Sequence, residues 1–147
     1  ALTSHSYYNM PRRVANGIDF NRLNMILAVL EKRCNLSLGT QDIYVNVIGG
    51  MKVDEPAVDL AVAMAVVSTY KNKVIDNKVV FIGEIGLSGE IRSISNIEKR
   101  VKEITKMGYK TIVGSKKQLT NLKEEFEKDV KFIGISTIDE AIEYILK

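Results

Sequence analysis

Apolar residues recur along the chain with helical spacing in some segments. Between Asp19 and Asn35, leucine and isoleucine recur at three- and four-residue steps, which predicts an amphipathic helix with Asp19 as its N-cap. The segment Ala57–Tyr70 is apolar on nearly every face, so we expect a central helix that is covered on several sides. Two further helices are expected to begin at Ser95 and Thr137, each with a capping box.

Shorter apolar runs between these helices are typical of strands. They are residues 43–48, 79–85, 90–94, 111–113 and 130–135. A glycine-bearing turn between the second and third runs predicts a hairpin, and the polar stretch Lys116–Lys128 predicts a short helix. The alternation of helices and strands indicates an α/β or α+β fold with a mixed sheet. We expect one domain over residues 19–147, with residues 1–18 as an N-terminal arm or strand that leads into it.

Composition indicates a globular domain. The chain has 147 residues, of which 46% are hydrophobic and 27% charged, and this excludes a disordered or collagen-like chain. Its single cysteine, Cys34, cannot form an intramolecular disulfide, so we expect a cytoplasmic location. No apolar run is long enough to span a membrane, and we expect no membrane partner. The chain begins at Ala1 without an initiator methionine, so we expect a fragment of a longer protein.

Charge is distributed unevenly. Residues 1–117 carry 17 basic and 11 acidic side chains, whereas residues 118–147 carry 4 and 7. A basic body is compatible with a polyanionic partner such as DNA, although surfaces that bind nothing also carry such charge.

Several kinds of site are not encoded. The chain has no Gly-x-x-x-x-Gly-Lys-Ser/Thr run for a nucleotide phosphate, and no Cys-x-x-Cys for structural zinc. Nothing in the sequence indicates that its one histidine, His5, lies beside Cys34 as a catalytic Cys–His couple requires. We therefore expect a surface histidine and a partly buried cysteine. The carboxylates of Asp54, Glu55 and Asp59 are most simply explained by the dipole at a helix N-terminus.

Two glycine-bearing turns make the sequence recognisable. They are Gly49-Gly-Met-Lys-Val-Asp-Glu-Pro-Ala57 and Gly83-Glu-Ile-Gly-Leu-Ser-Gly-Glu-Ile-Arg92, and further blocks lie at residues 11–22, 28–33 and 97–101. With these blocks the chain resembles the carboxy-terminal domain of the RadA family of bacterial recombination and repair proteins. That domain is itself similar to the proteolytic domain of Lon, which implies a Lon-like fold.

The resemblance also implies that the peptidase site has been lost. In Lon-type peptidases a serine follows an Asp-Gly-Pro run, and a lysine on a later helix is its base. Asp54-Glu55-Pro56 matches that run, so Ala57 takes the serine position and Glu98 takes the lysine position. Alanine offers no nucleophile, and a carboxylate leaves no Ser–Lys couple to activate one. For this chain alone we therefore expect no catalytic residues and no enzyme activity.

The RadA resemblance implies a place in a larger assembly. The parent protein would be an ATP-dependent DNA helicase that acts in branch migration, with ATP and magnesium in a preceding motor domain and zinc in an N-terminal finger. This chain would hold no cofactor itself. Implied partners are further copies in a homo-oligomeric ring, expected to be a hexamer, together with single-stranded or branched DNA and a recombinase. The implied location is the bacterial cytoplasm, in association with the nucleoid.

Basic residues near the two turns are the candidates for DNA contact through phosphates. They are Lys52, Arg92, Lys99, Arg100, Lys102, Arg12 and Arg13. Tyr7, Tyr8 and Tyr44 are able to stack on bases, and the first two equally suit an anchor on a neighbouring subunit. Two alternatives stay open, namely a working Lon-like serine peptidase with rearranged residues and an oligomerisation module that touches no nucleic acid.

Overall fold

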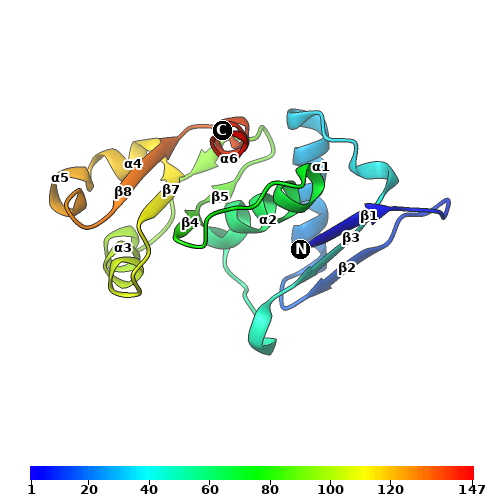
Figure 1. Cartoon of the computed structure of the whole chain (residues 1–147), viewed down its shortest axis with the longest axis horizontal. Helices are drawn as coiled ribbons and strands as arrows, with labels where there is room; N and C mark the ends of the chain where they lie inside the picture. The colour runs from blue at the N-terminus through cyan, green and yellow to red at the C-terminus, as the bar shows by residue number, and fades with distance from the viewer.

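Two three-stranded sheets flank a central helix in the computed structural model, which describes residues 1–147 (Figure 1). The first sheet has the order β1-β3-β2, in which β1 is antiparallel and β2 parallel to β3. The second has the order β4-β7-β8 and is parallel throughout, and β5 and β6 form a separate hairpin. Helices and strands alternate, so the predicted α/β class with mixed sheet directions is confirmed.

The strands are short and the helices are of very different lengths. The strands are β1 (Leu2–His5), β2 (Arg13–Asn16), β3 (Gln41–Asn46), β4 (Val79–Ile82), β5 (Glu84–Ile85), β6 (Ile91–Arg92), β7 (Thr111–Ser115) and β8 (Lys131–Ile135). The helices are α1 (Phe20–Cys34), α2 (Asp59–Lys71), α3 (Ile97–Lys106), α4 (Lys116–Thr120), α5 (Lys123–Phe126) and α6 (Ile138–Leu146). Single 3-10 turns lie at Leu38–Thr40, Ile48–Gly50 and Pro56–Val58. No helix has both the length and the apolar content that a membrane span requires.

Helix α1 begins and ends where the sequence predicts. The Asp19 carboxylate accepts a hydrogen bond from the Arg22 amide at 2.8 Å, so it caps the first turn. Asn35 ends the helix in the left-handed conformation with φ 53°, which asparagine tolerates better than most residues. The helix connects β2 to the parallel strand β3 as a βαβ crossover.

Residues 1–18 contain β1 and β2, and both strands pair with β3. Thr3 and Arg13 lie on either side of Ile43 in the ladder. Both strands are mostly exposed, so they lack the apolar run that makes a strand visible in a sequence. They are held by their backbone bonds to the buried β3.

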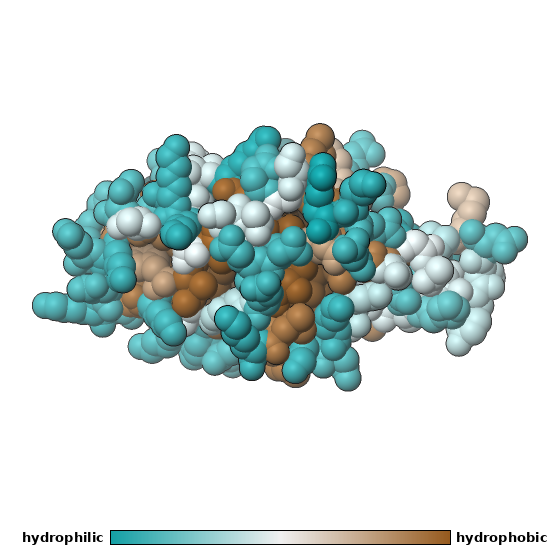
Figure 2. Space-filling model, turned by 90° about the horizontal axis from the view of Figure 1, so that it is seen from above, coloured by the Kyte–Doolittle hydropathy of each residue, from teal (hydrophilic) through white to brown (hydrophobic).

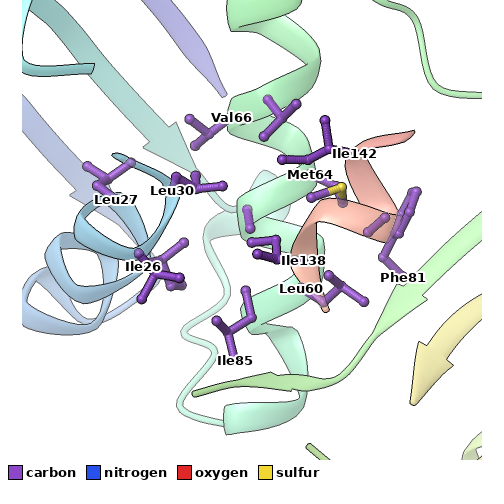
Figure 3. Close-up of a cluster of buried hydrophobic side chains, with 14 of the residues drawn as sticks. Ile26, Leu27, Leu30, Leu60, Met64, Val66, Phe81, Ile85, Ile138 and Ile142 are labelled. Carbon is purple, nitrogen blue, oxygen red and sulfur yellow. The ribbon is translucent and has the colours of Figure 1, made fainter. Parts of the chain in front are cut away.

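Helix α2 is the centre of the larger hydrophobic core, as its nearly uniform apolar character predicts. Figure 3 shows its side chains Leu60, Met64 and Val66 between α1 on one side and α6 and β4 on the other. A smaller core of five buried residues lies between α3, β7 and the α4–α5 segment. The helix begins at Asp59 rather than Ala57, because Pro56–Val58 forms a 3-10 turn first.

The predicted strand 79–85 is wrong as a single element because it breaks at Gly83. The Gly83 amide donates to the Ala57 carbonyl at 2.9 Å, and its carbonyl accepts from the Leu60 amide at 3.1 Å. The backbone of Gly83 therefore bonds to the segment at the start of α2 and not to a neighbouring strand. As a result, β4 and β5 belong to different sheets.

The predicted capping boxes are also wrong in detail. Helix α3 is preceded by Asn96 at φ 55°, with no side-chain cap, and Ser95 instead offers its carbonyl to Arg100. Thr137 does precede α6, but the Glu140 carboxylate accepts from the amide of Ser136 and the Thr137 side chain caps nothing. The polar stretch predicted as one helix forms the two short helices α4 and α5.

Candidate functional site

Ala57 is buried beside an apolar groove of about 520 Å³. The groove lies between the start of α2, strand β4 and helix α3, and its polar lining is confined to the α3 side, where Asn96, Lys99, Arg100 and Glu103 stand. No hydroxyl or thiol lines it. In this groove, the position that the Lon resemblance gives to the serine is therefore part of an apolar wall, whereas a smaller hollow that Ala57 also lines includes Ser93 and Ser95.

Glu98 lies outside this groove. Its side chain is exposed and accepts a hydrogen bond from Lys102 at 3.1 Å, one turn further along α3. It lines a separate shallow hollow with Lys99 and Lys102. The structure thus does not bring Ala57 and Glu98 together in one cavity.

Arg100 of α3 lines the groove beside Ala57. It forms an ion pair with Glu55, and its Nε donates to the Ser95 carbonyl at 2.8 Å. Both groups line a smaller hollow of about 170 Å³ that also includes Ala57. Arg100 therefore ties α3 to the segment before α2, and its charge is already matched.

Three other candidate cations also have partners. Arg92 pairs with Glu90 at 2.9 Å and lies 3.9 Å from Glu84. The pKa of Glu90 is lowered by the backbone amide of its own residue and then by Arg92. The Glu98 carboxylate likewise raises the pKa of Lys102. Arg13 is directed inward and donates to the carbonyls of Gln41 and Leu38, which makes it a structural residue.

Lys52 and Lys99 are exposed and form no ion pair. Lys52 lies in the loop after Gly49 and Gly50, both at positive φ, and this loop is held by a 2.6 Å hydrogen bond from the Val53 amide to the Gly17 carbonyl. Figure 1 places that loop and helix α3 on the same lower side of the molecule. Among the seven candidates, these two lysines and Arg12, which is also exposed, form no ion pair.

An ion pair between the partly exposed Arg22 and the buried Asp59 joins α1 to α2. Asp59 is 1% exposed, and both its oxygens accept from Arg22 at 2.5 Å. One oxygen also accepts from the Ile85 amide at 3.1 Å, and the hydrogen bond with Asp59 raises the pKa of Arg22. Asp59 does lie in the first turn of α2, as the dipole argument requires. Asp59 is a single carboxylate in an otherwise apolar helix. This pattern could have predicted an ion pair, because a buried charge needs a partner.

Cys34, Ser68 and His5 each contact other groups. Burial and a hydrogen bond with Asp139 raise the pKa of Cys34 to about 12, so its thiol stays protonated near neutral pH. The Ser68 hydroxyl donates to the Lys73 carbonyl at 2.5 Å, and the exposed His5 ring packs against Tyr7. No group of three or more histidine, cysteine, aspartate or glutamate side chains is placed to hold a metal ion.

Comparison with known proteins identifies relatives along the whole chain. The family model described as subunit ChlI of Mg-chelatase matches residues 17–118. Over 99% of its length the chain is 47% identical to DNA repair protein RadA of Listeria monocytogenes and 43% identical to that of Streptococcus pneumoniae. RadA of Halalkalibacterium halodurans is 42% identical over the same share. The chain spans about one third of the length of each relative: 32%, 34% and 32%.

These matches confirm the resemblance to RadA that the glycine-bearing turns indicate. The family model covers both turns, and the RadA relatives extend the similarity through the C-terminal strand and helix. The chain therefore belongs to the ChlI family, and nearly all of it is similar to about one third of DNA repair protein RadA.

Proposed function

We propose that this chain is a Lon-like domain without peptidase activity in a RadA-type DNA repair protein. In that protein it serves as a ring-assembly scaffold and supplies part of the DNA-contact surface, while ATP hydrolysis and strand movement belong to other parts of an ATP-dependent helicase. The observation that carries the proposal is the similarity to proteins named DNA repair protein RadA over 99% of the chain. ATP, magnesium and zinc are proposed for those other parts, and a recombinase is a further proposed partner.

The arrangement of cations supports a DNA contact through phosphates. Lys52 and Lys99 form no ion pair, and Arg92 and Lys102 are exposed enough to exchange their carboxylate partners for a phosphate. Contacts of this kind are independent of base sequence and weaken steeply as salt rises. A ring that slides on DNA of any sequence needs this kind of contact.

Replacing both free lysines is expected to weaken binding of single-stranded DNA. In a Lys52→Gln/Lys99→Gln variant, two lost phosphate contacts reduce the slope of log affinity against log salt by about 1.4. Fluorescence anisotropy of a labelled oligonucleotide across a salt series measures this slope. The matched control is Lys123→Gln/Lys128→Gln, which removes two exposed lysines at the α5 end of the molecule.

Equal slopes for the two double variants would contradict a role for Lys52 and Lys99 in DNA contact. If the wild-type chain gives no signal at low salt, although light scattering finds it oligomeric, the oligomerisation module without nucleic-acid contact is the correct function. The oligomer control matters because several linked sites raise an undetectable affinity by orders of magnitude.

Peptidase activity is expected to be absent, and restoring the serine alone is not expected to create it. In an Ala57→Ser variant the new hydroxyl lines an apolar groove. Glu98, which takes the lysine position, lies outside this groove, and Arg100, which lines it, is paired with Glu55 and cannot act as a base. A fluorogenic peptide or casein assay tests both forms. Clear hydrolysis by the wild type that Lys99→Ala or Ser68→Ala abolishes would establish the alternative of a rearranged peptidase.

A further inference from the structure

The connection between β1 and β2 forms a projection at one end of the molecule, which we name the β1–β2 tip (residues Ser6–Arg12). Figures 1 and 2 both show this right-hand end narrowing away from the body. Tyr7 is 91% exposed, Met10 84% and Tyr8 64%, and none of the three packs in either hydrophobic core. Large side chains that are held in solvent without a role in the core are typical of an interaction surface.

The tip is nevertheless anchored at its base. The Ser6 amide donates to the Thr40 carbonyl at 2.8 Å, and the Tyr8 amide donates to the Ser6 hydroxyl at 3.3 Å. At the other side, the Arg12 amide donates to the buried Asp42 carboxylate at 2.7 Å. These bonds fix both ends of the turn, so the two tyrosines are presented from a defined backbone.

Charge at the tip has one sign. Residues 1–18 contain Arg12, Arg13 and His5 and no acidic residue. Asp42 is the carboxylate beside the base of the tip, and its pKa is lowered by the hydrogen bond from the Arg12 backbone and also by the charges of Arg12 and Arg13. The Arg12 guanidinium lies 5.2 Å from the centre of the Tyr8 ring, a cation–π distance, and the His5 and Tyr7 rings meet edge to face at 5.4 Å.

We propose that the β1–β2 tip binds single-stranded nucleic acid by stacking bases on Tyr7 and Tyr8, with Arg12 contacting the backbone phosphates. Exposed aromatic rings beside an exposed arginine suit a single strand, because every base has a face to stack and every linkage has a negative charge. The inference rests on the proposed DNA contact. It adds a second location, remote from Lys52 and Lys99, where bases rather than phosphates supply the binding energy.

A second copy of this chain is the competing occupant, and its charge fits less well. Residues 1–18 contain no acidic side chain, so docking on the tip calls for an acidic patch, and the acidic C-terminal segment 118–147 carries four lysines among its seven carboxylates. A polynucleotide presents negative charge alone. The pattern at the tip therefore favours nucleic acid.

Binding of labelled oligothymidine to the 147-residue chain tests the proposal by anisotropy. The Tyr7→Ala/Tyr8→Ala variant is expected to bind at least about tenfold more weakly, since one stacked base contributes on the order of 5- to 150-fold in affinity. The variant keeps the wild-type dependence on salt, because stacking releases no counterions. Tyr7→Phe/Tyr8→Phe keeps the rings and is expected to bind as the wild type does. Phe20→Ala, which removes an exposed aromatic ring outside the tip, is the matched control.

Tyrosine fluorescence gives a second readout because the chain has no tryptophan. Oligothymidine is expected to quench the emission of the wild type, and to quench Tyr7→Ala/Tyr8→Ala much less.

If Tyr7→Ala/Tyr8→Ala binds as the wild type does while Lys52→Gln/Lys99→Gln binds more weakly, the tip does not bind nucleic acid and the proposed function is still supported. No binding by the oligomeric wild type would overturn both. Unchanged affinity with a smaller particle in light scattering would overturn the proposal in favour of a second copy at the tip.

Discussion

Arg22→Met is expected to lower the free energy of unfolding by about 3 kcal/mol, since it leaves a buried carboxylate without its cation. Asp59 is 1% exposed and would keep only its hydrogen bond from the Ile85 amide. Methionine retains much of the aliphatic length of arginine, so the loss reports the missing charge more than missing packing. Urea unfolding followed by circular dichroism measures the change.

Two further variants make the experiment specific. In Arg22→Met/Asp59→Leu neither charge remains, and this double variant is expected to be more stable than Arg22→Met because no unpaired carboxylate is buried. Lys106→Met removes the cation of the exposed Lys106–Glu103 pair on α3 and is expected to cost less than about 0.5 kcal/mol. If Arg22→Met costs no more than Lys106→Met, the pair does not contribute to the stability of the α1–α2 contact.

Leu60→Ala is expected to destabilise the fold by about 3 kcal/mol, through the lost transfer energy of the side chain and the cavity that remains. Leu60 is fully buried in the first turn of α2 and lies in the cluster of Figure 3 between α1, β4 and α6. Its neighbours come from several elements, so the site cannot collapse without moving the central helix. The same unfolding experiment measures the effect.

Leu87→Ala is the matched control for this prediction. Leu87 is 66% exposed in the turn between β5 and β6, so the same chemical change there is expected to stay within about 0.5 kcal/mol. Similar losses for the two leucines would mean that α2 is not the centre of the core. A large loss for Leu60 alone would support the layered arrangement in Figure 1.

Short sequence patterns predicted an element well where the apolar face of a helix or its capping residue lies within that element. Helix α1 begins after Asp19 and ends at Asn35 because its cap and its apolar stripe are contained within the segment itself. The α3 cap was predicted wrongly because Ser95 and Glu98 fit a capping box locally. The Ser95 carbonyl instead accepts from Arg100, whose guanidinium also pairs with Glu55, a contact that local spacing cannot reveal.

Some features of the candidate site could likewise be predicted from the sequence, and others could not. That Ala57 has no nucleophile follows from the residue type alone, and the similarity to RadA could be read from ordered blocks of sequence. Which cations are free could not be read, because Arg100, Arg92 and Lys99 look alike in a sequence. Only their surroundings distinguish Lys99, which has no partner, from Arg100, which is bonded to Glu55.

By itself the sequence determined the α/β class and the central apolar helix, because residue type and short-range periodicity encode both. Ordered blocks of sequence carry the resemblance to RadA, and that resemblance implies the missing serine. The tertiary structure alone decided that β1 and β2 flank β3, that Gly83 splits a strand, and that Asp59 is neutralised by Arg22. The partners in the Arg22–Asp59 and Arg100–Glu55 pairs are 37 and 45 positions apart. Contacts over such separations exist only after the helices and sheets have packed, so no local pattern records them.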